Sequence, residues 1–245
     1  MNKLKYLILP LMALLGITSV AFALHSPTHY SFFGEASYLE PAGNGSTRGV
    51  HLTSDSSPGF AGIDYGIESG TTFADISTLS TDYRFESDDS CAGGSPRFQV
   101  ELASPDNSDT GNVFVYLGPP PSYTNCPSGV WLNTGDLLEG ANPVDTSQLN
   151  GGTFYDPYAA ALTKYGSYTV TGIQLVADAS WAFVDGEQAF DVDNTLIDAT
   201  LFTYERPVPT HKDECENDGW RELGRPDGSG FSDKEACRKF VKRGI

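Results

Sequence analysis

The sequence predicts an all-β protein, a jelly-roll or Greek-key β-sandwich with a small disulfide-stapled helical appendage at its C-terminus. Short apolar or alternating stretches recur at intervals of about ten residues, as in sandwich proteins. Turns rich in Gly, Pro, Ser and Asn separate them, and helical patterns are scarce. The four cysteines form two separate groups, one inside the strand-rich region and one in the tail. These observations favour two facing sheets and a separate stapled unit.

A hairpin over residues 97–102 and 112–117 is the clearest pair of strands. The first segment alternates apolar and polar residues, the pattern of a strand with one buried face. The second is almost continuously apolar, which indicates a strand in the interior. Cys91 and Cys126 stand just outside the two ends, so a disulfide between them would tie the hairpin at its base.

The remaining elements follow from the same patterns. Residues 156–164 are the one convincing helix before the tail, because Pro157 occupies the first turn and alanines follow. The other predicted strands cover residues 30–39, 50–53, 59–66, 79–87, 131–135, 167–177, 180–184, 188–193 and 199–204.

The N-terminus has the pattern of a secretory signal. Lys3 and Lys5 precede an apolar stretch over residues 7–20, and Ala21-Phe22-Ala23 fits a cleavage site. We expect a signal peptide at 1–23, a β-sandwich domain at 24–205, a Pro-rich linker at 206–211 and a Cys-stapled motif at 212–245. An uncleaved N-terminal anchor is the alternative to cleavage. The expected location is extracellular.

The tail predicts a miniature folded unit. Ser232 and Glu235 form a capping box ahead of a helix whose last turn carries Lys239, Lys242 and Arg243. Four cysteines allow three connectivities, and proximity favours Cys91 with Cys126 and Cys215 with Cys237. The two loops of 35 and 22 residues would each stabilise the fold by about 3 to 4 kcal/mol. Zinc is a weaker alternative, because no Cys-x-x-Cys is present.

Charge is distributed unevenly along the chain. Residues 24–204 contain four basic and 23 acidic residues, a net charge of −19, whereas residues 205–245 contain nine of each. A domain with this much negative charge repels nucleic acid and anionic membranes, so we expect neither as a partner.

The tail resembles a recurrent C-terminal element of secreted bacterial β-sandwich proteins of unassigned function. The resemblance rests on Lys212-Asp-Glu-Cys215, Asn217-Asp-Gly-Trp220 and Cys237-Arg-Lys-Phe-Val241, about thirty residues. The region before it is similar to the domain that often precedes this element. The corresponding places are Leu79-Ser-Thr-Asp-Tyr83, Gly94-Ser-Pro-Arg-Phe98, Asn112-Val-Phe-Val-Tyr116 and Val192-Asp-Asn194. The resemblance implies a kind of secreted protein and no particular activity.

No catalytic motif stands out, and we assign no catalytic residues. Asp109-Thr-Gly111 is the triplet of aspartic proteases, but it has no second copy and no apolar approach strand, so a turn is the better interpretation. The four histidines lack zinc-binding spacing, and His51 is expected to be structural. A pair of carboxylates on a cleft, as in glycosidases, stays open because the domain is rich in Asp and Glu.

Asp191 and Asp193 are the candidate metal ligands. They alternate with Phe190 and Val192, so both carboxylates should project from the face opposite the core. The segment is similar to the closing strand of jelly-roll carbohydrate-binding modules, where such a pair helps to hold a structural Ca²⁺. A solvated strand edge is the alternative.

Aromatic residues near predicted loops are the candidate ligand-binding residues. Tyr65, Tyr123, Trp131 and Trp181 would stack on sugar faces, with core packing as the alternative for each. We therefore expect a secreted noncatalytic binding module for extracellular carbohydrate or cell-wall material, with Ca²⁺ as a candidate support. The alternatives are a structural or adhesive surface protein and, third, a glycan-processing enzyme that uses paired carboxylates.

Overall fold

The computed structural model describes residues 29–55, 59–92, 94–139, 142–178 and 187–243. The predicted signal peptide, Trp181 and the predicted strand at 180–184 lie outside this part of the chain. The strands are β1 (Tyr30–Leu39), β2 (Gly49–Ser54), β3 (Ala61–Tyr65), β4 (Leu79–Phe85), β5 (Arg97–Ala103), β6 (Thr110–Tyr116), β7 (Leu132–Asn133), β8 (Pro143–Val144), β9 (Asp156–Pro157), β10 (Thr169–Ala177), β11 (Gln188–Ile197) and β12 (Thr200–Phe202). The helices are the 3-10 turns η1 (Phe73–Asp75) and η2 (Gly219–Arg221), α1 (Tyr158–Tyr165) and α2 (Lys234–Arg243).

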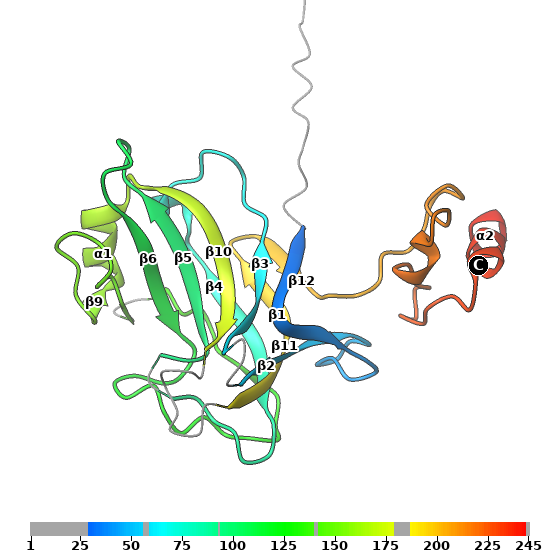
Figure 1. Cartoon of the computed structure of the whole chain (residues 1–245), viewed down its shortest axis with the longest axis horizontal. Helices are drawn as coiled ribbons and strands as arrows, with labels where there is room; N and C mark the ends of the chain where they lie inside the picture. Colours follow the sequence, from blue (N-terminus) through cyan, green and yellow to red (C-terminus); the bar gives the residue numbers. More distant parts are fainter. Residues whose placement is uncertain (1–28, 56–58, 93, 140–141, 179–186, 244–245) are drawn as a thin grey trace, which may run out of the picture.

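The predicted all-β sandwich is confirmed. Ten of the described strands form one curled antiparallel sheet in the order β6-β5-β10-β3-β1-β2-β11-β4-β7, with β12 paired to β11 (Figure 1). Strands β8 and β9 form a separate two-stranded sheet. The chain crosses repeatedly between the two layers of the curl. Strand β3 lies in one layer and the next strand, β4, in the other, and β10 and β11 are divided in the same way. This crossing between layers is what a Greek-key or jelly-roll connection requires.

Strand β1 turns the sheet back on itself. Its first half pairs with β3 and its second half with β2, and the change of partner falls between Gly34 and Glu35. Gly34 has a φ of +62°, and a Cβ there would lie 2.1 Å from the carbonyl oxygen of Phe60. Only glycine fits this backbone conformation and this close approach. The bend lets the two layers face each other.

The core lies between the two layers. Alternate residues of the strands are fully buried, including Val50 and Leu52 from one layer and Ile63, Phe98 and Val100 from the other. The predicted alternation over residues 97–102 therefore corresponds to a real buried face. The disulfide between Cys91 and Cys126 is present, with a Cα–Cα distance of 5.2 Å, and lies at the edge of this core.

The C-terminal unit has its own small core. The disulfide between Cys215 and Cys237 joins α2 to the segment before η2, and Leu223 and Phe231 complete the buried cluster. Trp220 packs against this cluster. In Figure 1 this unit lies apart from the sheets, on the side away from β6 and α1. No helix in the described residues is long and apolar enough to cross a membrane.

The start of the predicted linker is anchored rather than free. The carboxylate of Glu205 accepts hydrogen bonds from the backbone N–H groups of Thr47 and Arg48 and from the Thr47 hydroxyl, at 2.6–2.9 Å. The Arg206 guanidinium donates to Glu40 at 2.8 Å. These contacts tie the chain to the loop between β1 and β2 before it enters the C-terminal unit. The domain boundaries themselves stay a prediction.

Candidate functional site

A pocket walled by aromatic rings, prolines and amides lies where β4 and the end of β6 meet the loops after β6 and β7. Its volume is about 320 Å³. The side chains that line it include Tyr83, Tyr116, Tyr123, Pro119, Pro120, Pro127, Pro143, Asn133, Thr134 and Asn142. Flat apolar walls with a few amide and hydroxyl groups suit a ligand that has both apolar faces and hydroxyls.

Tyr123 forms the link between this pocket and the surface. Its ring packs on Tyr116, with centroids 4.8 Å apart, and stacks on Tyr155 at 5.9 Å with an interplanar angle of 10°. Phe154 follows at 6.5 Å from Tyr155. Tyr155 and Phe154 are 58% and 63% exposed, so the row of rings ends in two solvent-facing aromatics. We call these two residues the aromatic pair.

Two hydroxyl groups in this row have different surroundings. The Tyr116 hydroxyl donates to the carboxylate of Asp145 at 2.5 Å. The Tyr123 hydroxyl is buried and has no hydrogen-bond partner in the described part of the chain. Burial raises the pKa of Tyr123, so the group stays a neutral donor. A buried donor without a partner costs free energy that a ligand oxygen can recover.

Three of the four predicted ligand-binding residues fall within the described chain, and they do not form one platform. Tyr65 is 4% exposed and lies in the core, where its hydroxyl meets that of Tyr204 at 2.6 Å. Its strand directs the ring inward, so this placement does not support the predicted ligand-binding role. Tyr123 lines the pocket but is only 4% exposed. Trp131 is half-buried, outside the pocket lining, with the guanidinium of Arg84 4.9 Å from the centre of its ring.

The aromatic pair was missed by the sequence analysis. Residues 145–155 have no strand or helix periodicity, so the sequence predicts no element there. The available signal was two adjacent aromatics after Gly151 and Gly152 in an otherwise polar stretch. Asn142 was also overlooked, since Asn142-Pro143 is typical of a turn.

Asp191 and Asp193 project from the same face of β11, as predicted, but have different partners. Asp191 is 3% exposed and is ion-paired with Arg84 at 2.6 Å and with His51 at 2.8 Å. His51 and Arg84 are its direct cross-strand neighbours on β2 and β4. A carboxylate that is already ion-paired with Arg84 and hydrogen-bonded to His51 is unsuited to Ca²⁺, so the structure does not favour the predicted pair as a joint ligand set.

Asp193 lies opposite Asp82 on β4 instead. Asp193 accepts hydrogen bonds from the Ser46 hydroxyl and from the backbone N–H groups of Asn44 and Asn194, at 2.5–2.7 Å. The Asp82 carboxylate accepts from the amide groups of Asn44, Asn133 and Asn194, at 2.7–2.9 Å. Every hydrogen-bond partner described for these two carboxylates is neutral, and burial raises the pKa of Asp193.

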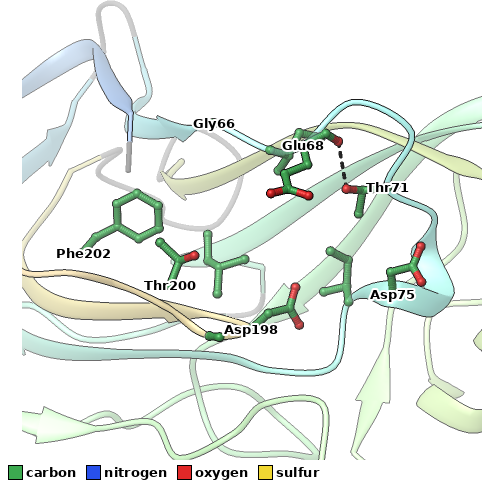
Figure 2. A pocket seen from close by; sticks show the side chains of 11 residues that line it. Gly66, Glu68, Thr71, Asp75, Asp198, Thr200 and Phe202 are labelled. Carbon is green, nitrogen blue, oxygen red and sulfur yellow. Dashed lines mark hydrogen bonds between the residues drawn. The ribbon is translucent and has the colours of Figure 1, made fainter. Parts of the chain in front are cut away.

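A second, acidic pocket of about 280 Å³ lies between the loop after β3 and the β11–β12 turn. Figure 2 shows the carboxylates of Glu68 and Asp198 on opposite sides of it. Oδ1 of Asp198 accepts hydrogen bonds from the backbone and hydroxyl of Ser77. The hydroxyl and backbone N–H of Thr72 lower the pKa of Asp75. These contacts hold the turns in place. The shift at Asp75 is opposite in direction to the raised pKa of a carboxyl group that acts as a general acid.

Comparison with known proteins assigns no family. No protein-family model matches the chain, and no curated protein matches it. Two solved structures are similar in part. One is an exo-beta-agarase, at a TM-score of 0.38 and 12% identity, covering 72% of this chain and 24% of that chain. The other is the xyloglucanase domain of NopAA, a type three effector from Sinorhizobium fredii, in complex with cellobiose.

The second likeness has a TM-score of 0.23 and 14% identity and covers 70% of this chain and 97% of that domain. The match to the agarase spans about a quarter of that protein's chain. Both TM-scores are too low to carry an argument about function.

Proposed function

We propose that this protein is a noncatalytic binding module for extracellular carbohydrate. The observation that carries the proposal is the pocket walled by tyrosines and prolines, joined through Tyr123 to the exposed aromatic pair. Sugar rings present apolar C–H faces that stack on aromatic rings, while their hydroxyls pair with amides such as Asn142.

The binding mode that this geometry supports has two parts. One sugar unit would occupy the pocket between Tyr83 and Pro119, and the continuing chain would lie across the aromatic pair.

A glycan array with the purified protein tests the proposal, followed by calorimetry with the best ligand. Removing the stacking surface with Phe154→Ala and Tyr155→Ala should weaken binding by about 1 to 3 kcal/mol, because each exposed ring contributes stacking area. Phe60→Ala is the matched control, since Phe60 is 46% exposed and lies outside the pocket lining. All variants should keep the wild-type unfolding temperature within a few degrees.

Failure to bind any polysaccharide would overturn the proposal. It would favour the second candidate, a structural or adhesive surface protein. The burial of Tyr65 and Tyr123 supports that candidate. Equal losses of affinity in Phe60→Ala and Tyr155→Ala would also contradict the assigned surface.

Ca²⁺ support is a separate part of the proposal, and Asp193 with Asp82 is the pair that fits it. The two buried carboxylates have neutral partners, and the amides of Asn44, Asn133 and Asn194 can each present an oxygen after rotation. Carboxylate and amide oxygens are the ligands that Ca²⁺ takes.

Free Ca²⁺ at about 100 times its Kd should stabilise the protein by about 2.7 kcal/mol, measured as a rise in Tm. Asp82→Asn should abolish the rise, and Mg²⁺, which requires a smaller octahedral site, should not reproduce it. An unchanged Tm in wild type would remove the ion from the proposal without touching the aromatic site.

A further inference from the structure

A groove with a strongly basic lining lies on the C-terminal unit, away from the pocket described above. Its volume is about 450 Å³. The lining consists of Lys212, Glu235, Arg238, Lys239, Lys242 and Arg243, all of them exposed. We call the five cations of this set the basic face. It contrasts with a sandwich region of net charge −19.

The fold assembles this face from two segments. Arg238, Lys239 and Lys242 are spaced at three and four residues along α2, so they share one side of the helix. Lys212 comes from the segment three residues before Cys215. The disulfide from Cys215 to Cys237 fixes that segment against α2. The staple thus sets the geometry of the groove as well as the stability of the unit.

Little of this charge is neutralised within the unit. Arg238 approaches the carboxylate of Glu216 at 3.5 Å. Within the residues that the structure describes, no ion pair involves Lys212, Lys239, Lys242 or Arg243. Glu235 is the single acidic side chain in the lining. The groove is therefore an open site of net positive charge for an anionic ligand.

An anionic membrane is a poor fit for this face. Interfacial helices bind membranes by burying an apolar side in the lipid. The apolar side of α2, which includes Phe240 and Val241, already packs against the buried cluster around Cys237 and Phe231. Charge alone would then have to hold the protein to the membrane, without an apolar surface to insert.

Single-stranded nucleic acid is also a poor fit. Its bases stack on aromatic rings, and none of the described residues that line the groove is aromatic. The ring of the nearby Trp220 is already covered by the guanidinium of Arg221, 4.6 Å from its centre. The basic face suits a flexible linear polymer with regularly spaced negative charges and no need for stacking. The Cβ atoms of basic residues three or four positions apart on α2 lie about 5 to 6 Å from each other, so their side chains can reach charges on successive units of such a polymer.

We propose that the basic face binds a linear acidic polysaccharide through its carboxylate or sulfate groups. The choice of a polysaccharide rests on the proposed carbohydrate-binding function, whereas the polyanion itself rests on the basic face alone.

Polygalacturonate and dextran sulfate are the probes, with uncharged dextran as the reference, and binding to the full protein is measured at 50 and 200 mM NaCl. We expect Kd for a charged probe to rise about tenfold or more over this range, since bound cations displace counterions. Lys239→Glu with Lys242→Glu should raise Kd at 50 mM NaCl about tenfold or more. Lys239→Gln with Lys242→Gln should have a smaller effect in the same direction.

Lys242→Glu alone and Arg221→Glu change the net charge equally, and Arg221→Glu is the control because Arg221 is exposed and lies outside the groove. Wild-type affinity in this control, with loss in the α2 variants, supports the proposal. Unchanged affinity in the α2 variants, or equal loss in all variants, overturns it. The choice of partner is overturned by tighter binding to phosphatidylglycerol vesicles or to an oligothymidylate than to the charged polysaccharides. It is also overturned if the protein dimerises in a salt-sensitive way and binds no polysaccharide.

The two functional proposals fail in distinguishable ways. Loss of binding in Tyr155→Ala with no effect of the α2 variants would leave the aromatic site standing and remove the basic face. The reverse pattern would keep the basic face and contradict the aromatic site. Intact disulfides and an unchanged circular dichroism spectrum exclude misfolding of the C-terminal unit as the cause.

Discussion

His51 shows how one cross-strand pair changes the chemistry of a residue. Its Nδ1–H donates to Asp191 at 2.8 Å, and its Nε2 meets the Thr53 hydroxyl at 3.0 Å. The hydrogen bond with Asp191 is the main reason that the pKa of His51 is raised above 6.5, and burial opposes it. The histidine that the sequence indicated as structural is thus held in a polar row on the outer face of the sheet.

This shift predicts a pH dependence of stability. Because the folded-state pKa is raised, the stabilisation is fully present below the unfolded pKa of about 6.5 and is lost as pH rises through the folded value. The side chain is partly exposed, so the loss should be at most about 1 kcal/mol. Urea unfolding between pH 5 and 9 should show this loss in wild type and less of it in His51→Gln. An NMR titration giving His51 a pKa of 6.5 or below would contradict the assignment.

At the scale of an element, β1 depends on a single glycine. Gly34→Ala should destabilise the protein by about 2 kcal/mol or more, because it adds left-handed strain and a clash with the backbone of Phe60. Gly45→Ala is the control, since Gly45 also has a positive φ of +75° but nothing within 4 Å of an added Cβ. It should cost about 1 kcal/mol. Equal denaturation midpoints for the two variants would mean that the bend tolerates a side chain.

The predicted elements agree with the structure where periodicity was strong. Strand β1 was predicted at its observed bounds, and the hairpin of β5 and β6 was shifted by one or two residues. The predicted helix at 156–164 begins at Tyr158, because Asp156 and Pro157 pair with β8 as β9. Such short pairings depend on a partner brought close by the fold, and local sequence does not specify them.

At the scale of the whole molecule, the two disulfides should have separable effects. Below about 40 residues a unit seldom buries enough apolar surface to fold alone, so the C-terminal unit needs Cys215 and Cys237. Cys215→Ser with Cys237→Ser should expose this unit to limited proteolysis and leave the sandwich Tm within a few degrees. Continued protection of α2 would contradict that dependence. The basic face should lose polyanion binding in the same variant, since Lys212 would separate from α2.

The sequence by itself determined the all-β class, the two local cystine bridges and the stapled tail, because these depend on residue period and spacing within short segments. Only the tertiary structure decided which aromatics face solvent and which carboxylates share a site. Tyr65 is directed into the core, whereas Tyr155 emerges above Tyr123 from a loop without periodicity. Asp193 meets Asp82 across a strand pair 111 positions apart in the chain. Contacts at that separation follow from how the layers close, and no local pattern records them.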